Sequence, residues 1–323
     1  MLIDAYARRF TYLRLSITES CNFRCSYCLP DGPDCSSRKD ELTLPEIKRL
    51  VKAFALLGTR KVRITGGEPS LRKDLTDIIA ACKQTDGIEQ VALTTNGYRL
   101  QRDLSSWQQA GLDAINVSVD SLDAATFHLV TGENRLPAIL DGIEQAMAAG
   151  IDKVKLNTVL LRQHNALQLP DFLEFVRDKA VSLRFIELMR TNDNQNYYQK
   201  QHLSGTSIQQ HLLKQGWQLQ QKGKCAGPAL EYAHPNYQGQ IGLIMPYSKD
   251  FCADCNRLRV SSRGQLFLCL FTEQHQNLRH LLQDDNPEPL MHYLQRAVLG
   301  KAASHELHQG NSGSTRHLAM IGG

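Results

Sequence analysis

The sequence predicts an α/β protein, in which an incomplete (β/α)6 TIM-type barrel is followed by a smaller C-terminal α+β domain. Over about the first 190 residues, short β-branched segments alternate with amphipathic segments, a pattern typical of parallel βα units. Six such units fit into this length, whereas eight would close a full barrel. Beyond about residue 192 the alternation stops. A doubly wound open sheet is the alternative, because the order of the strands cannot be read from the sequence.

Each predicted strand of the first region is a short run rich in β-branched or other apolar residues. The six runs are residues 13–18, 61–65, 90–95, 114–120, 153–161 and 181–188. The clearest helix between them covers residues 43–57. Its start, Thr43-Leu44-Pro45-Glu46, is typical of a capping box with proline in the first turn.

The second region has a different rhythm. The polar residues 191–201 predict a surface loop, and residues 207–215 predict a helix. A strand is expected at 240–245, and two short runs at 258–260 and 265–269, joined by Ser261-Ser262-Arg263-Gly264, predict a β-hairpin. We therefore divide the chain into a barrel domain at 1–204 and a C-terminal domain at 205–323.

Composition narrows the classes of function. The chain has 323 residues, 42% of them hydrophobic and 22% charged, as in ordinary globular proteins. A net charge of +4 gives no reason to expect nucleic acid. No leader-like segment and no run of roughly 20 apolar residues indicates secretion or a membrane span. Nine cysteines, partly in two tight clusters, are interpreted as reduced metal ligands, which implies the cytoplasm.

Three cysteines follow the first predicted strand, in the pattern Cys21-x-x-x-Cys25-x-x-Cys28. This spacing offers three thiolates to one centre and supplies no fourth ligand nearby. A structural zinc site normally has four protein ligands. A cubane iron–sulfur cluster usually takes four cysteines, so three leave one iron open to another ligand. We therefore favour a cluster with an open iron over a structural zinc site.

A second cysteine trio lies near the C-terminus and consists of Cys252, Cys255 and Cys269. Cys-x-x-Cys is a common zinc half-site, but a fourth ligand is not obvious. Cys225 lies 27 residues before the trio, and the nearest downstream histidine is His275. We predict a second cluster with an open iron. Strand alternation places Arg257 and Arg259 on the same side beside it, which makes a surface for an anion and a base.

Polar residues gather where the predicted strands end, and this is where α/β barrels carry their chemistry. The second strand ends in Gly66-Gly67-Glu68-Pro69. Its glycines leave the backbone free to approach a ligand and Glu68 adds an acceptor, although a plain tight turn is the alternative. Other strand ends carry Thr94, Ser118 and Met189. Hydroxyls and amides there suit a sugar or purine, although each alone could cap a helix.

Basic residues occur within four of the predicted strands, namely Arg14, Lys61, Arg63, Lys155 and Arg184. Charges flanked by neighbouring strands rarely point into a barrel unless anions pair with them. A solvated outer face is the alternative for Lys61 and Arg63, which share one face of their strand. The five together favour a pocket for a polyanion, because arginine and lysine both suit phosphates.

The first cysteine loop resembles the signature of the radical S-adenosylmethionine (SAM) enzymes, in which the open iron chelates SAM. Nearly the whole chain is similar to the GTP 3′,8-cyclase family of molybdenum cofactor synthesis. The similarity is carried by that loop, residues 66–69 and 251–259, Cys269-Leu270-Phe271 and the final Ile321-Gly322-Gly323. It implies a lyase that makes (8S)-3′,8-cyclo-7,8-dihydroguanosine 5′-triphosphate. SAM would yield a 5′-deoxyadenosyl radical, which abstracts hydrogen from C3′ of GTP before that carbon attacks C8.

The same resemblance implies two [4Fe-4S] clusters and assigns roles to residues. The SAM-cleaving cluster would be held by Cys21, Cys25 and Cys28, and the auxiliary, guanine-binding cluster by Cys252, Cys255 and Cys269. The SAM contacts would be Tyr27, Gly67, Ser118 and Met189. The GTP contacts would be Arg14, Lys61, Arg63, Thr94, Lys155, Arg184, Arg257 and Arg259. Catalysis would involve Arg257 and Arg259, together with a flexible tail of Gly322 and Gly323 that enters the active site; a frayed tail is the alternative.

Two parts of the chain, residues 190–193 and 304–317, depart from the family pattern. Cys35, Cys82 and Cys225 fit neither trio and are expected to be ordinary thiols. The expected partners are GTP, SAM, an electron donor such as flavodoxin or ferredoxin, and the next molybdopterin-pathway enzyme as product acceptor. A homodimer is one option for the oligomeric state. The rival functions are a radical SAM enzyme that modifies a peptide and a non-catalytic regulator with zinc in both trios.

Overall fold

The computed structural model describes residues 1–29, 40–151, 153–223, 226–272, 274–313, 319 and 321. Within them, twelve strands form one sheet in the order β12-β11-β10-β1-β2-β3-β4-β5-β6-β9-β8-β7. The first six strands are β1 (Tyr12–Ser16), β2 (Lys61–Thr65), β3 (Gln90–Thr95), β4 (Ala114–Ser118), β5 (Lys153–Leu160) and β6 (Ser182–Glu187). The others are β7 (Gln218–Leu219), β8 (Leu230–Ala233), β9 (Gln240–Ile244), β10 (Arg257–Val260), β11 (Gln265–Phe267) and β12 (Gln276–Asn277).

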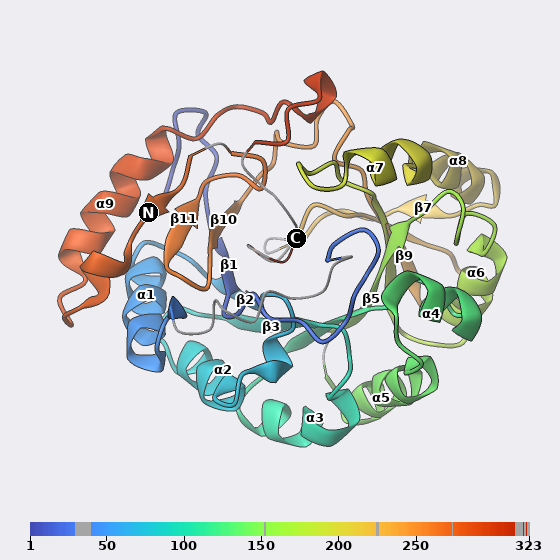
Figure 1. Ribbon diagram of the computed structural model, residues 1–323, viewed down its shortest axis with the longest axis horizontal. Helices are drawn as coiled ribbons and strands as arrows, with labels where there is room; N and C mark the ends of the chain where they lie inside the picture. The colour runs from blue at the N-terminus through green and yellow to red at the C-terminus, as the bar shows by residue number, and fades with distance from the viewer. Residues whose placement is uncertain are drawn as a thin grey trace.

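The helices cover the outer side of the curved sheet, as Figure 1 shows. They are α1 (Leu44–Leu56), α2 (Leu75–Lys83), α3 (Leu100–Gln109), α4 (Ala124–Thr131), α5 (Leu136–Ala148), α6 (Leu169–Arg177), α7 (Gln195–Gln201), α8 (Thr206–Lys214) and α9 (Glu288–Leu299). In the described part of the chain, none of them is long and apolar enough to cross a membrane.

The predicted fold class is confirmed. Strands β1 to β6 pair in parallel in chain order, and each lies within two residues of its predicted bounds. The capping box of α1 is also present, because the Thr43 amide donates to Glu46 Oε2 at 2.8 Å and the Glu46 amide donates to Thr43 Oγ1 at 3.4 Å. The antiparallel pairing of β10 with β11 confirms the predicted hairpin.

The C-terminal region extends the same sheet at both of its edges. Strand β10 pairs in parallel with β1, and β9 pairs in parallel with β6. Eight neighbouring parallel strands therefore surround the inner face, two more than the first region supplies. The remaining four strands, β7, β8, β11 and β12, are antiparallel additions. The division of the chain at residue 205 stays a prediction.

The polar stretch 191–201 is a correction, since a loop was expected and α7 forms instead. Asn194 stabilises its start by accepting a hydrogen bond from the Thr191 amide at 2.8 Å. At its end, the buried Gln201 side chain bonds to Gln163 in both directions, at 2.7 and 3.0 Å. Docking through polar side chains stabilises this helix, so it lacks the apolar stripe by which helices are recognised in a sequence.

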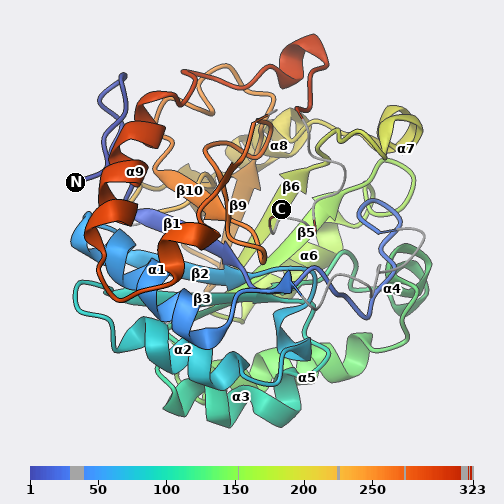
Figure 2. The ribbon, with the colours of Figure 1, turned by 60° about the vertical axis from the view of Figure 1, so that its left-hand side comes forward.

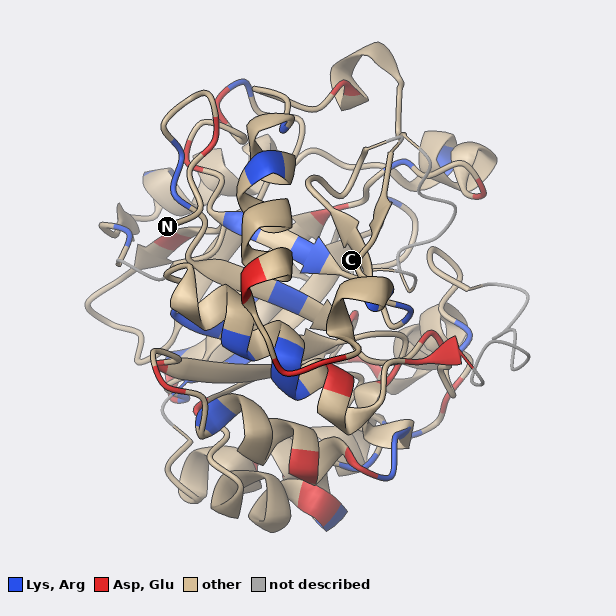
Figure 3. Cartoon of the chain, turned by 90° about the vertical axis from the view of Figure 1, so that its left-hand side faces the viewer, with Lys and Arg blue, Asp and Glu red and all other residues tan. Residues whose placement is uncertain are grey.

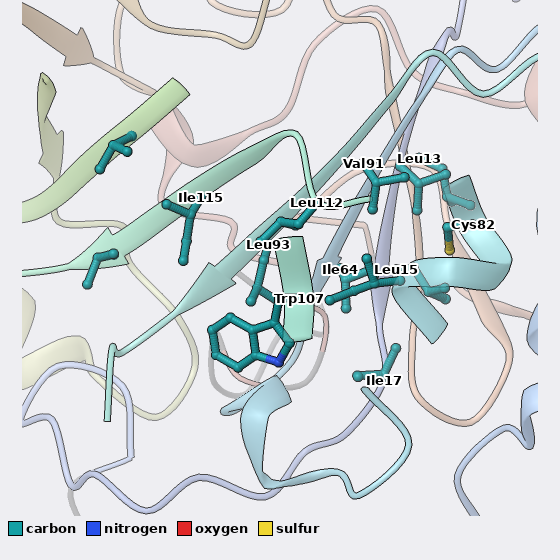
Figure 4. Close-up of a cluster of buried hydrophobic side chains, with 14 of the residues drawn as sticks. Leu13, Leu15, Ile17, Ile64, Cys82, Val91, Leu93, Trp107, Leu112 and Ile115 are labelled. Carbon is teal, nitrogen blue, oxygen red and sulfur yellow. The ribbon is translucent and has the colours of Figure 1, made fainter. Parts of the chain in front are cut away.

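The main core lies between the outer face of the sheet and its helices. Figure 4 shows Leu13, Leu15 and Ile17 from the β1 segment beside Ile64, Val91 and Leu93 from the next two strands. Trp107 of α3 packs there, only 1% exposed. Cys82 is fully buried in the same cluster, and burial raises the pKa of its thiol to about 12, as expected for an ordinary core cysteine. Because β1 alternates, Arg14 faces the opposite, inner side.

Candidate active site

One cavity inside the barrel carries both cysteine trios on its wall. The lining includes Cys21, Cys25, Cys28, Cys252, Cys255 and Cys269. The first trio follows β1, and the second lies around β10 and after β11, so adjacent strands deliver both. All six side chains are partly buried. Cys28 and Cys252 are 224 positions apart in the sequence, and the parallel pairing of β1 with β10 brings the two trios together.

The first trio is fastened to the end of β2 by the glycine pair after it. The Gly67 amide donates to the Thr18 carbonyl at 2.8 Å, and the Glu68 amide donates to the Ser20 carbonyl at 2.7 Å. A Cβ on Gly67 would lie 2.3 Å from that Ser20 oxygen, which is sterically impossible without a backbone shift. The glycine is therefore required by the close approach of the cysteine loop. Gly67 itself also lines the cavity.

Glu68 has a structural position that the sequence did not indicate. Its side chain is fully buried and its carboxylate accepts three hydrogen bonds, from the Ser70 amide (2.9 Å), Thr95 Oγ1 (2.7 Å) and the Asn96 amide (2.6 Å). Burial outweighs these bonds and raises the pKa of Glu68. Glu68 ties the end of β2 to the end of β3 and lies behind the cavity wall.

The wall beside the first trio is acidic. Tyr27 Oη donates to Asp120 Oδ2 at 2.9 Å, and the Val159 amide donates to Oδ1 at 2.9 Å. Burial raises the pKa of Asp120 to about 6, so the carboxylate is ionised at neutral pH. Tyr27, Asp120, Ser118 and Met189 all line the cavity, which brings the predicted SAM contacts together with the first trio.

The wall beside the second trio is cationic. Arg257 and Arg259 line the cavity there, and the Arg257 guanidinium lies 5.6 Å from the centre of the Phe251 ring. Burial alone would raise the pKa of the Cys255 thiol, but Arg257 and Lys301 outweigh it and lower the pKa to about 7. The thiolate form of Cys255, which metal ligation requires, is therefore more accessible near neutral pH than that of an ordinary cysteine.

Strand register explains why cations far apart in sequence meet. Residues in register on parallel strands lie at one level, and alternate residues share a face. Arg14 on β1 is level with Arg63 on β2 and with Arg259 on β10. Figure 3 shows basic residues on neighbouring strands across the middle of the molecule. Burial, and then Arg259 and Arg63, lower the pKa of Arg14, as expected where like charges lie close together.

Tyr12 occupies the level below Arg14. Lys61 Nζ lies 4.9 Å and Arg63 Cζ 5.6 Å from the centre of its ring. Burial opposes ionisation of the phenol, but Arg63 and Lys61 together lower the pKa of Tyr12 to about 8. Lys61 and Arg63 are only 4% and 6% exposed, so the alternative of a solvated outer face is wrong for both.

Arg184 enters the cavity from the opposite side and is positioned by β8 and β9. It forms an ion pair with Glu231 of β8. Gly242 of β9 makes room for it, because a Cβ there would lie 2.8 Å from Arg184 Cγ. Burial, and then Arg184, lower the pKa of the nearby Lys155 to about 6. Of the eight predicted GTP contacts, six line the cavity that the described residues form, whereas Lys61 and Lys155 are not part of its lining.

Each trio offers three sulfur donors, which is the number that a [4Fe-4S] cluster with one open iron takes. Among the described residues, no three histidine, cysteine or acidic side chains are grouped closely enough to hold one ion. Tetrahedral zinc would draw three sulfurs to within about 4 Å of one another. A cubane takes each cysteine on a different iron and so tolerates a wider spacing.

The cavity also contains a buried polar side chain without a hydrogen bond. No described partner bonds either amide atom of Asn116.

Comparison with known proteins agrees with this geometry. Residues 15–176 match the model of the radical SAM superfamily, and residues 181–307 match that of the molybdenum cofactor synthesis C-terminal domain. Over the whole chain, the sequence is 54% identical to the GTP 3′,8-cyclase of Cronobacter sakazakii and 55% identical to that of Yersinia pestis, covering 99% of each.

This chain belongs to the GTP 3′,8-cyclase family. As a radical SAM family member, it has the cysteine loop that implies a [4Fe-4S] cluster and SAM. The crystal structure of Streptococcus suis SuiB bound to S-adenosylmethionine has the same fold, with a TM-score of 0.61 and 13% identity over 91% of this chain and 68% of that one.

Several cavity residues of this family member were not singled out from the sequence. Tyr12, Asn116 and Asn157 each lie two positions from a predicted contact on the same strand. Because alternate residues of a strand share a face, alternation could have identified them. Lys301 and His305 also line the cavity, but they lie outside the strands and no periodic signal marks them.

The structure describes Ile321, the residue before the predicted glycine tail, but not the tail itself. Gly322 and Gly323 lie outside the described residues, as do Cys35 and Cys225. Arg259 Nη1 donates to the Ile321 carbonyl at 3.2 Å, and Ile321 packs with Phe267 and Leu307. The chain is therefore held at the cavity immediately before the two glycines.

Proposed function

We propose that this chain converts GTP to (8S)-3′,8-cyclo-7,8-dihydroguanosine 5′-triphosphate, the first step of molybdenum cofactor synthesis. The observation that carries the proposal is that two cysteine trios and a layer of buried cations share the wall of one cavity. When bound, the first cluster and SAM would supply the 5′-deoxyadenosyl radical that takes hydrogen from C3′ of GTP. The second trio would hold the auxiliary [4Fe-4S] cluster that meets the guanine.

The residues of the cavity have separate tasks in this reaction. The acidic side at Tyr27 and Asp120 suits the cationic sulfonium of SAM, and Gly67, Ser118 and Met189 line the same part. The layer of Arg14, Arg63 and Arg259 suits the triphosphate, since one guanidinium group can donate two parallel hydrogen bonds to the oxygens of a phosphate. Together they would fix C3′ near the site of radical formation, and positioning is the main demand of the step.

Arg257 and Arg259 are proposed to act on the nucleotide beside the second trio, with Thr94, Lys61, Lys155 and Arg184 as further contacts. Gly322 and Gly323 are proposed to enter the cavity, where residues without side chains meet no steric obstacle. Phe251, Leu270 and Phe271 line this part and exclude water, which protects a reactive carbon radical. The electron donor is proposed to be flavodoxin or ferredoxin, and the product would pass to the next pathway enzyme.

Isotope transfer tests the proposal directly. Anaerobically reconstituted, reduced protein is incubated with SAM and GTP carrying deuterium at C3′. We expect 5′-deoxyadenosine with one deuterium and a nucleotide isomer of GTP that separates from it by chromatography. GTP with deuterium at C2′ is the matched control and should transfer none. Unlabelled 5′-deoxyadenosine from the C3′ substrate, or turnover of SAM without any nucleotide product, would reject the function.

A further inference from the structure

Two buried cations outside the predicted site hold the loops of the second cysteine trio. Arg8 lies in the N-terminal segment, and Lys301 is the second residue after the end of α9. They are only 8% and 5% exposed, although both side chains are long and charged. Figures 1 and 2 show the N-terminal segment beside the chain that leaves α9. Two cations on segments from opposite ends of the chain thus meet at one place.

Arg8 joins three separate segments through its guanidinium. Its Nε donates to Asp4 Oδ2 at 2.6 Å, and its Nη1 donates to the carbonyls of Cys252 at 3.1 Å and Ala303 at 2.7 Å. Its Nη2 donates to the Ala302 carbonyl at 2.6 Å. The planar fork can satisfy these acceptors only in one orientation. The carbonyl of a predicted cluster ligand is therefore fixed by the N-terminal segment.

The turn that presents Arg8 is itself under strain. Ala7 has a φ of 61°, in the left-handed region that is unfavourable for a residue with a Cβ atom. Asp4 Oδ1 accepts from the amides of both Tyr6 and Arg8 at 2.9 Å and closes the turn. Such strain persists where the surrounding contacts over-determine the conformation. The turn is maintained by the same carboxylate that orients the guanidinium.

Lys301 acts on the other half of the trio. Its ammonium donates to the carbonyl of Leu268, the residue before Cys269. It lies 5.5 Å from the centre of the buried Phe10 ring, which confines it there. Lys301 lines the same cavity as the three cysteines. Between them, the two cations hold the loops of Cys252 and Cys269.

We propose that Arg8 and Lys301 are positioning residues for the second cysteine trio, and that their charge favours the reduced form of the cluster it holds. Arg8 fixes the ligand loop, and Lys301 supplies the nearer charge on the cavity side. A reduced cluster carries one more negative charge, so a buried cation stabilises it more than the oxidised form. The inference rests on the proposed function, because it requires a cluster on the second trio.

The experiment uses full-length protein in which Cys21, Cys25 and Cys28 are serine, so that only the second cluster can bind. The ratio of reduced to oxidised cluster is measured by electron paramagnetic resonance at one fixed applied potential. We expect Lys301→Met to lower this ratio about tenfold. Lys301→Arg keeps the positive charge and should leave the ratio at the parent value. The first cluster, measured in full-length Cys252→Ser protein with and without Lys301→Met, should keep its ratio.

Two substitutions of Arg8 distinguish its effect on the geometry of the ligand loop from the effect of its charge. Arg8→Gln should shorten the half-life of the second cluster against an iron chelator about tenfold. Arg8→Lys keeps the charge but lacks the forked guanidinium group. Its second cluster should therefore be lost to the chelator as fast as in Arg8→Gln, while the ratio of reduced to oxidised cluster stays at the parent value. An unchanged ratio in Lys301→Met together with an unchanged half-life in Arg8→Gln would overturn the inference. No iron uptake by the second trio in the parent protein would instead reject the proposed function.

Discussion

The two cysteine trios share a cavity but differ in the charges around them. Beside the first, burial raises the pKa of Cys21 to about 11 and, with Asp120, raises that of Cys25 well above its usual range. Beside the second, Arg257 and Lys301 outweigh burial and lower the pKa of Cys255 to about 7. Similar ligand sets are therefore placed in opposite electrostatic surroundings.

This difference in charge predicts that SAM and GTP bind at different sides of the cavity. A sulfonium is attracted to the side with Asp120 and repelled from the side with Arg257 and Arg259, whereas a triphosphate is attracted and repelled in the opposite sense. Because the cavity is partly shielded from water, these preferences are stronger than they would be at the surface. We therefore expect the charge asymmetry to direct SAM to one side of the cavity and GTP to the other, and variants at either side test this expectation.

Removal of one ligand from each trio should have the largest effect. Cys252→Ser should abolish cyclisation while SAM cleavage continues, because only the second trio is damaged. Cys25→Ser should abolish both reactions. Product formation and 5′-deoxyadenosine are measured together, and Cys82→Ala, in the core cluster, is the control. Cyclisation by Cys252→Ser at the parent rate would show that the two trios are not distinct in role.

Loss of a cation from the cavity should weaken GTP binding alone. We expect Arg259→Ala to raise the Kd for GTP about 100-fold, since charged hydrogen bonds contribute about 1.5–3 kcal/mol each. The Kd for SAM should change by less than about threefold. Arg263→Ala is the matched control, because this arginine of the same hairpin pairs with Glu19 away from the cavity. Equal weakening of both ligands would contradict the charge separation.

The depressed pKa of Lys155 predicts proton uptake when GTP binds. At about 6 it leaves the lysine mostly neutral at pH 7.5, and a nearby triphosphate raises the pKa and draws in one proton. GTP affinity should therefore fall as pH rises from 7 to 8.5, by up to about tenfold per unit. Calorimetry in two buffers of different ionisation enthalpy counts the proton. Lys155→Met should remove that proton from the count, and an unchanged count would contradict the assignment.

Substitution of Asp120, on the acidic side of the cavity, should have the smallest effect on ligand binding. Asp120→Asn removes one charge near the first trio while leaving an acceptor for Tyr27. We expect SAM affinity to fall by about 1 kcal/mol, or about fivefold, with GTP affinity unchanged or slightly improved. Tyr27→Phe retains the carboxylate and separates the hydrogen bond from the charge. A GTP affinity that falls with that of SAM would indicate a structural defect instead.

The sequence predicted most of the barrel because its strands obey local rules. The bounds of β2 and β3 agree with prediction, since both are β-branched runs that end in turn residues. The pairing of β10 with β1 had no local signal, because register between distant strands depends on tertiary packing. The helix α7 was missed for a related reason, since polar docking through Gln201 replaces an apolar stripe.

For the site, cysteine spacing and strand alternation selected residues that line one cavity in the structure. The basic residues of the strands were predicted to share one pocket, and the register of β1 and β2 places two of them, Arg14 and Arg63, at one level. The role of Glu68 could not be predicted, because its three donors come from two segments that the sequence does not relate. Lys301 was missed because its position follows from where α9 ends and not from any motif.

The parallel pairing of β10 with β1 also constrains biosynthesis of the protein. Arg14 acquires its neighbour Arg259 only after about 260 residues have left the ribosome. Until then β1 has an unsatisfied edge, and pairings of such long sequence separation form late. Metal loading of the second trio would therefore follow synthesis of β10 and Cys269, and a nascent chain stalled before β10 should be open to proteolysis along β1.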